Sequence, residues 1–291
     1  MNKIAQDRVV IVTGAGEGLG RSHALELARH GACVVVNDVG DSANSTVEEI
    51  VGSGGVAIAS IGDVADWQYS ASLIDAAVSM FGALDALVNN AGLVRDKMLV
   101  NMSEEEWDLV VRVDLKGHFC PLRHASAYWR EQSKNATPRS ARVVNTTSGA
   151  GLLGSLGQSN YVAAKAGVAA LTLVAAVELA RYGVTVNAIA PAARTSMTEE
   201  VFAVTMAAPE SGFDIMSPDN VAPLVTWLVS EESGDVTGRV FEVSGGLVSV
   251  ADGWQPGRPA EKNGRWDPSE LGPVVRTLLD EAPTPAPVYG A

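Results

Sequence analysis

Tyr161 and Lys165 stand four residues apart in a segment with helical character, which places both side chains on one face of a helix. A lysine ammonium beside a tyrosine favours the phenolate, which can exchange a proton with a substrate oxygen. Ser148 follows the strand-like run 142–145, and its hydroxyl could hold the same oxygen. Each feature is common alone. Together they predict acid–base chemistry on an alcohol or a ketone, with Ser148, Tyr161 and Lys165 as catalytic residues.

The segment 13–20, TGAGEGLG, follows a β-branched run and opens a helical pattern. Glycines at this position allow backbone N–H groups to approach a pyrophosphate at the N-terminus of a helix. Asp38 lies about 20 residues further on, at the end of the next strand-like run, where an acid binds the ribose hydroxyls of adenosine. Its carboxylate would repel the extra phosphate of NADP, and neither Glu17 nor Val39 supplies a compensating cation. We therefore predict NAD as the cofactor.

Short β-branched runs alternate with longer helical patterns over most of the chain. Strands separated by helical crossovers predict an α/β, single-domain Rossmann fold, a doubly wound parallel sheet of about seven strands with helices on both faces. This domain is expected to span residues 1–250 and to bind both NAD and substrate. The run 103–130 is expected to form one helix. Strands are expected at 9–12, 32–36, 56–60, 86–88, 142–145, 184–189 and 240–243, and further helices at 21–30, 66–81, 160–182 and 220–228.

Residues 251–291 are expected to form a C-terminal extension. Seven of the thirteen prolines lie from Asp252 onward, and a short helix is expected at 270–279. Trp254 and Trp266 are costly to leave in water, so we expect the extension to pack near the substrate loop or across a subunit boundary, with a frayed end at 283–291.

Composition excludes several functions. The formal net charge is -13, which opposes nucleic-acid binding. The start of the chain lacks the pattern of a signal peptide, and the longest apolar tract, 168–177, is too short to span a bilayer. Two cysteines without a pairing pattern favour a cytoplasmic protein. The four histidines lack metal-ligand spacing, so we predict no metal site and interpret them as packing or helix-surface residues.

From about Arg8 to Gly246 the sequence resembles the short-chain dehydrogenase/reductase family. The family's glycine motif, its Asn-Asn-Ala-Gly motif at 89–92 and its Ser, Tyr and Lys all match in order and spacing. The resemblance also implies that Asp63 and Val64 contact adenine, that 187–191 and Thr195 bind the nicotinamide carboxamide, and that the protein is a dimer or tetramer. The implied cofactor-binding residues are Gly14, Glu17, Gly18, Leu19, Gly20, Asp38, Asp63, Val64, Asn90, Ala91, Gly92, Tyr161, Lys165, Pro191 and Thr195.

Two departures from the family matter. Asp114 stands where the family has an asparagine whose backbone carbonyl holds a water next to the lysine. We add Asp114 to the catalytic list as a carboxylate acting on Lys165; alternatively it points away and pairs with Lys116 or Arg112. Ala192 replaces a glycine and the following loop is shorter, so either Thr195 or Ser196 could bind the carboxamide.

Several segments, among them 35–38, 157–161 and 221–225, resemble the branch formed by the dehydrogenase module of the peroxisomal multifunctional β-oxidation enzyme. This branch implies oxidation of a 3-hydroxyacyl-CoA or a hydroxysteroid in lipid or sterol catabolism. An apolar substrate fits the expected substrate loop 195–217, which carries Met197, Val201, Phe202, Met206 and Phe213. The alternatives are a 3-oxoacyl-thioester reductase, which normally prefers NADP, and a non-catalytic NAD-binding sensor, which would be expected to lose the tyrosine.

Overall fold

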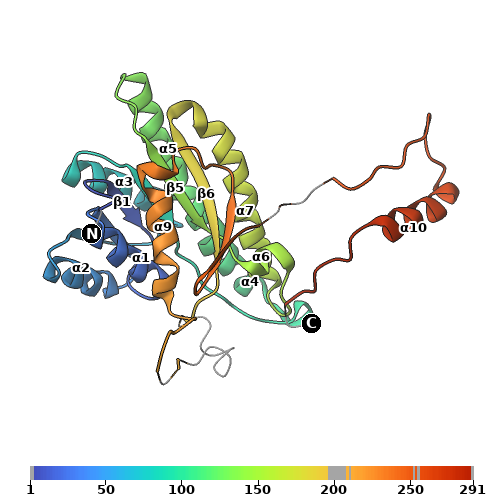
Figure 1. The fold of residues 1–291 in the computed structure, drawn as a ribbon, viewed down its shortest axis with the longest axis horizontal. Coiled ribbons are helices and arrows are strands. Elements are labelled where there is room, and N and C mark those ends of the chain that lie inside the picture. The colour runs from blue at the N-terminus through green and yellow to red at the C-terminus, as the bar shows by residue number, and fades with distance from the viewer. Residues whose placement is uncertain (1–2, 196–207, 210, 252, 254–255, 290–291) are drawn as a thin grey trace.

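A computed structural model describes residues 3–195, 208–209, 211–251, 253 and 256–289. It has one central sheet between two layers of helices, and an extension that projects from this body (Figure 1). The α/β fold class predicted from the alternation of strand and helix patterns is confirmed.

The sheet has the order β3-β2-β1-β4-β5-β6-β7-β8 within the described residues. The strands β1, β4, β5 and β6 are buried on both faces because they are runs of Val, Ile, Leu and Ala with few polar side chains. The order reverses between β1 and β4, and in sheets of this topology ligands bind at the carboxyl ends of the strands beside such a reversal. The strands are β1 Val9–Val12, β2 Cys33–Asp38, β3 Val56–Ile61, β4 Ala86–Asn89, β5 Ala141–Thr146, β6 Val184–Pro191, β7 Val240–Ser244 and β8 Leu247–Ala251.

The parallel sheet of about seven strands is confirmed, and the described residues add an eighth strand to it. The missed strand, β8, pairs antiparallel with β7. Gly245, at φ +53, and Gly246 make the tight turn between the two strands. A hairpin at the sheet edge needs no helical crossover, so the alternation of strand and helix patterns gave no signal for it.

Two layers of helices cover the sheet. Residues of α1, α2 and α9 share one hydrophobic core with one face of the sheet, and residues of α3, α5 and α7 share a second core with the other face. Helices α2 and α6 were not predicted. The helices are α1 Gly18–Arg29, α2 Ser42–Gly52, α3 Trp67–Phe81, α4 Glu104–Val110, α5 Gly117–Lys134, α6 Gly149–Leu153, α7 Ser159–Leu179, α9 Ala222–Val229 and α10 Leu271–Glu281.

The prediction of one helix over residues 103–130 is wrong in the middle of this range. A π-helical segment, Val111–Lys116, separates α4 from α5. Pro121 lacks the N–H that would bond the carbonyl of Gly117, which further interrupts the α-helical hydrogen-bond ladder in this region. Such a π-helical insertion turns the following side chains by a fraction of a turn, and Asp114 lies within it.

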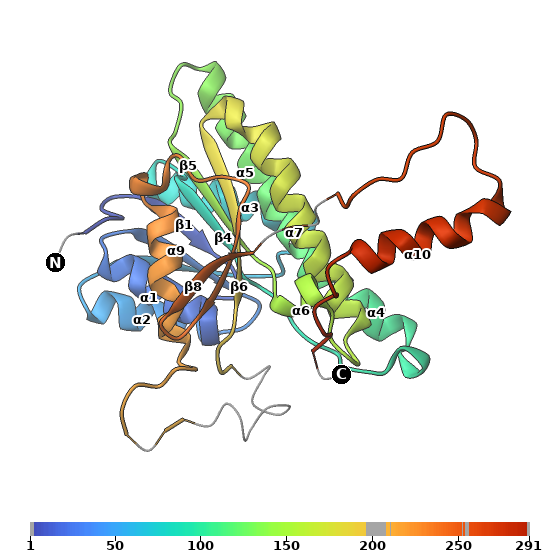
Figure 2. The same ribbon diagram turned by 45° about the vertical axis from the view of Figure 1, so that its right-hand side comes forward.

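The C-terminal extension leaves the body after β8 and carries α10 away from it, and the chain then returns beside α6 and α4 (Figure 2). Trp254 lies outside the described residues. Trp266 lies under Lys262 within the extension, with 5.3 Å between the ammonium and the ring centroid. Tyr289, by contrast, pairs with Ser155 of the body. The extension therefore does meet the body, but through Tyr289 rather than through Trp266.

Candidate active site

The predicted catalytic and cofactor residues gather at the carboxyl edge of the sheet. The glycine-rich loop follows β1, the segment 90–92 follows β4, Ser148 follows β5 and the segment 192–195 follows β6. Parallel neighbouring strands bring these four loops to one edge, at the point where the strand order reverses.

Lys165 is 2% exposed and connects the two elements that carry Ser148 and Tyr161. Its Nζ donates a hydrogen bond to the carbonyl of Thr146 at 3.0 Å and lies 5.6 Å from the centroid of the Tyr161 ring. The hydroxyl of Thr147 donates to the backbone carbonyl of Lys165 at 2.6 Å. The end of β5 is thus fixed to the first turns of α7, where the ammonium faces the tyrosine.

Ser148 is the N-cap of α6, and its hydroxyl accepts a hydrogen bond from the N–H of Ala150 at 3.2 Å. Helix α6 lies directly on α7, because a Cβ atom at Gly151 would stand 2.7 Å from the Cβ of Lys165. A glycine is therefore needed there for the serine-bearing turn to reach the lysine-bearing helix.

Asp114 points at Lys165, not at Lys116 or Arg112. Its carboxylate is fully buried, with Oδ2 3.2 Å from Lys165 Nζ and Oδ1 accepting the N–H of Leu93 at 2.8 Å. Burial raises the pKa of Asp114, and the Lys165 ammonium opposes this. Arg112 pairs with Asp63 instead. The side chain of Asp114 is therefore placed to act on the charge of Lys165.

Two further residues of this region were not assigned to the site from the sequence. Asn160 is fully buried beside Tyr161, and its Nδ2 donates to the carbonyls of Arg95 at 3.0 Å and Glu106 at 3.2 Å. Asn160 therefore connects the start of α7 both to the loop after β4 and to helix α4. His118 is fully buried, and burial together with the nearby Lys165 ammonium holds its pKa well below the usual value. For Asn160 and His118, the sequence offered one signal: a polar side chain at a position that the hydrophobic periodicity assigns to the buried face of a helix.

The glycine-rich loop has a shape that only glycine permits at several positions. Gly14 and Gly18 have φ of +59 and +52. A Cβ atom at Gly14 would stand 2.8 Å from Ala91 Cα, and one at Gly20 would stand 2.1 Å from the carbonyl oxygen of Gly14. Glu17 is the N-cap of α1 and makes no side-chain capping bond, and Leu19 packs against the core. The loop thus makes a tight turn that opens α1, and the N-terminus of a helix favours an anionic group such as a phosphate.

Asn90 holds this loop in place. Its Nδ2 donates to the carbonyl oxygens of Thr13 at 3.1 Å and Gly14 at 3.2 Å, while its N–H and that of Ala91 donate to the Thr13 hydroxyl. Gly92 lies on the other side, where an added Cβ would stand 3.3 Å from Lys165 Nζ. The segment 90–92 therefore joins the glycine-rich loop to Lys165.

Asp38 ends β2 next to the glycine-rich loop. Its Oδ2 accepts the N–H of Gly16 at 3.0 Å and its Oδ1 accepts the N–H of Gly40 at 3.3 Å. The carboxylate is thus fixed beside the glycine-rich turn, as the prediction that it binds a ribose requires.

The other predicted cofactor residues lie on both sides of this loop. Asp63 accepts the N–H of Ala65 at 2.8 Å, and Val64 is buried after β3. Pro191 ends β6 and Thr195 is buried, with its Cγ2 3.5 Å from where a Gly18 Cβ would stand. The loop candidates Ser196, Met197, Val201, Phe202 and Met206 lie outside the described residues, whereas Phe213 is described and exposed.

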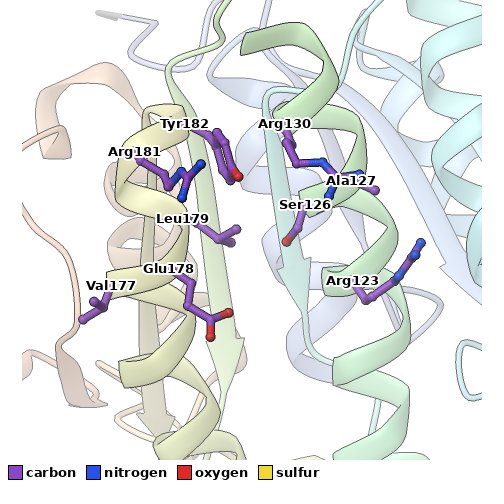
Figure 3. A pocket seen from close by; sticks show the side chains of 9 residues that line it. All are labelled: Arg123, Ser126, Ala127, Arg130, Val177, Glu178, Leu179, Arg181 and Tyr182. Atoms are coloured by element: carbon purple, nitrogen blue, oxygen red, sulfur yellow. The ribbon is translucent and has the colours of Figure 1, made fainter. Parts of the chain in front are cut away.

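A groove of about 490 Å³ between α5 and α7 contains none of the predicted site residues (Figure 3). It is lined by Arg123, Arg130 and Arg181 together with Glu178 and Tyr182. It lies roughly 25 Å further along α7 than Tyr161. The groove is therefore separate from the candidate active site.

The segment 159–182, made of α7 and one further turn, is long and apolar enough to cross a membrane by length and composition. In the structure it covers the sheet, and Lys165, Val168 and Thr172 on it are buried. We interpret it as a core helix. Among the residues that the structure describes, no group of three His, Cys, Asp or Glu side chains is arranged to hold a metal ion.

Comparisons with known proteins place these motifs in context. A family model described as short chain dehydrogenase matches residues 8–204. Hydroxyacyl-CoA dehydrogenase ChsB1 of Mycobacterium tuberculosis is 47% identical over 278 residues, covering 92% of this chain and 87% of that protein. Mouse peroxisomal multifunctional enzyme type 2 is 38% identical over 279 residues, 92% of this chain but 34% of that protein.

Two further matches come from a reductase and from a solved structure. The 3-oxoacyl-[acyl-carrier-protein] reductase FabG of Staphylococcus aureus is 40% identical over 247 residues, 81% of this chain and 96% of that protein. A crystal structure of a short chain dehydrogenase from Mycobacterium avium superposes with a TM-score of 0.91 at 55% identity, over 99% of this chain and 100% of that one.

Proposed function

This chain belongs to the short-chain dehydrogenase family, and we propose that it oxidises the secondary alcohol of a 3-hydroxyacyl-CoA to the ketone with NAD, in lipid or sterol catabolism. It is an oxidoreductase that acts on CH–OH groups. The observation that carries the proposal is the fixed arrangement of Ser148, Tyr161 and Lys165 beside the glycine-rich loop. The retained Tyr161 opposes a non-catalytic NAD-binding sensor.

Each catalytic residue has one task in this scheme. Ser148 holds the substrate oxygen, and Tyr161 as phenolate accepts the hydroxyl proton. Lys165 stabilises the phenolate by its charge, and Asp114 limits that charge. When NAD is bound, it supplies the acceptor for the hydride that leaves the carbon bearing the substrate hydroxyl. In the reverse direction Tyr161 returns the proton to the oxygen of the ketone.

The residues of the cofactor loop fit a dinucleotide. The positive φ of Gly14 and Gly18 and the close contact at Gly20 allow a tight turn at the N-terminus of α1 that residues with a side chain could not form. We propose that this turn and the N-terminus of α1 hold the pyrophosphate, and that Asp38 binds the ribose hydroxyls and rejects NADP. Asp63 and Val64 would meet the adenine, and Pro191 and Thr195 the nicotinamide side.

The experiment is a panel of 3-hydroxyacyl-CoA thioesters and hydroxysteroids, each with NAD and with NADP, followed by absorbance of the reduced cofactor. We expect the thioesters with NAD to give the highest kcat/KM. Higher kcat/KM with hydroxysteroids would overturn the substrate assignment while leaving the reaction type intact. The second candidate is a 3-oxoacyl-thioester reductase, favoured by the 40% identity to such an enzyme and tested by turnover of 3-oxoacyl thioesters with NADPH.

We also propose that the protein is a cytoplasmic homo-oligomer, a dimer or a tetramer. Its two cysteines are free, as in a reducing compartment. Helix α7 leaves Leu173, Val174 and Val177 exposed, and such apolar patches mark subunit contacts. Light scattering coupled to size exclusion would give the subunit number.

A further inference from the structure

The end of the C-terminal extension is hydrogen-bonded to the loop between α6 and α7. The N–H of Leu156 donates to the carbonyl of Tyr289 at 3.0 Å, and the N–H of Tyr289 donates to the carbonyl of Gly154 at 3.2 Å. This loop, residues 154–158, connects the helix that Ser148 caps to the helix that carries Tyr161. The end of the extension is thus attached between the two catalytic elements.

The side chains of this end lie against two glycines, and Gly149 provides space for the ring of Tyr289. A Cβ atom at Gly149, next to Ser148, would stand 2.8 Å from Tyr289 Oη and 3.3 Å from its Cε2. A Cβ atom at Gly154 would stand 3.4 Å from both methyl groups of Val288. Tyr289 therefore lies against the backbone beside the catalytic serine, yet it keeps 47% of its surface exposed.

The surroundings of this contact are apolar and open. Leu153 at the end of α6, Leu156 in the loop and Met98 are all exposed, and Met98 Sδ stands 3.9 Å from where a Gly157 Cβ would be. Together with Val288 and Tyr289, these three residues form one apolar cluster. Exposed apolar side chains gathered beside reactive groups are typical of a ligand-binding surface.

We propose that Val288 and Tyr289 form a wall of the substrate site and bind the acyl chain of the thioester remote from the reacting carbon. Tyr289 is a positioning and specificity residue in this arrangement. It holds the loop 154–158 and contacts the chain, and it takes no part in proton transfer. The assignment rests on the proposed function, which supplies a substrate that carries an acyl chain.

The first test uses the full chain without substrate. Hydrogen exchange of the loop 154–158 is compared between wild type and Tyr289→Ala. We expect the Leu156 N–H, which donates to Tyr289, to exchange faster in the variant, while the Gly154 N–H, which donates to Ala150 at 2.7 Å, keeps its rate. Val275→Ala removes an exposed side chain from α10 of the same extension and is the matched control. An unchanged Leu156 exchange rate would overturn the docking.

The second test compares 3-hydroxybutyryl-CoA with 3-hydroxyhexadecanoyl-CoA. Tyr289→Ala should raise KM for the long thioester about tenfold, as expected for the loss of one apolar wall, and leave kcat and the KM of NAD within about twofold. The short thioester should be unaffected, and Tyr289→Phe, which keeps the ring, should behave as wild type. An equal rise for both thioesters, or no rise, would overturn the acyl-wall assignment.

The two tests separate the proposals. A wild-type enzyme that turns over neither thioester overturns the proposed function and the acyl assignment with it. The exchange measurement still decides, without substrate, whether Tyr289 holds the loop. Faster exchange of the Leu156 N–H in Tyr289→Ala together with normal thioester kinetics would leave the docking standing and overturn the role in substrate binding.

Discussion

Asp114→Asn should move the pH dependence of alcohol oxidation without destroying activity. The carboxylate of Asp114 is buried against Lys165, so it offsets part of the positive charge that stabilises the Tyr161 phenolate. An amide of nearly the same shape removes this charge and can still accept the N–H of Leu93. The phenolate should then form at lower pH, and the rising limb of the kcat/KM profile should shift with it.

The size of the shift follows from the geometry. Asp114 Oδ2 lies 3.2 Å from Lys165 Nζ, which lies 5.6 Å from the Tyr161 ring centroid. The carboxylate is therefore on the order of 10 Å from the phenolic oxygen, where a unit charge contributes about 1.7 kcal/mol at an effective dielectric of about 20. Because about 1.4 kcal/mol changes a proton equilibrium tenfold, we expect the limb to move down by about one pH unit.

The assay is the initial rate of alcohol oxidation from pH 5 to pH 10 at constant ionic strength, with NAD affinity measured separately. Asp108→Asn is the matched control, since it makes the same chemical change on the exposed face of α4. An unchanged profile would refute the electrostatic role of Asp114. A shift to higher pH would also refute it, because it would mean that Lys165 loses its own proton when the carboxylate is removed.

Three further predictions concern the cofactor, the proton and the fold. Wild type should prefer NAD to NADP by at least about a hundredfold in kcat/KM, because Asp38 repels the extra phosphate of NADP. Asp38→Ser should lower this preference for NAD, and equal use of the two cofactors by wild type would contradict the role of Asp38. Tyr161→Phe should lower kcat by about a hundred- to ten-thousandfold and leave the Kd of NADH, from fluorescence titration, nearly unchanged, and a normal kcat would mean that the proton leaves by another route. Burial lowers the pKa of His23 to about 3, below its ordinary 6.5, so the unfolded chain takes up a proton on this histidine before the folded protein does. The contribution of neutral His23 to the free energy of unfolding is therefore complete above pH 6.5 and is lost as the pH falls toward 3. Between pH 6.5 and 5 the free energy of unfolding should fall by about 2 kcal/mol through this group, and His23→Leu, measured by urea denaturation, should show a shallower decline.

The sequence by itself determined the fold class and indicated the main candidate site residues, because each depends on local spacing. Runs of valine and isoleucine between helical patterns predict the strands of a parallel sheet, and glycines at 14, 18 and 20 mark a turn that other residues cannot form. The i, i+4 spacing of Tyr161 and Lys165 fixes their common helix face. These features follow from backbone geometry over a few residues.

Only the tertiary structure decided how distant segments act on these residues. The direction of Asp114 depends on the π-helical segment and on its contact with Lys165, 51 positions away in the sequence, and no local pattern distinguished this contact from pairing with Lys116 or Arg112. The eighth strand depends on a hairpin that falls outside the strand–helix alternation. Tyr289 meets the loop 154–158 across more than a hundred residues, where Gly149 leaves space for its ring. Such contacts depend on packing between helices and strands that are distant in the sequence, and the local spacing of residues does not reveal that packing.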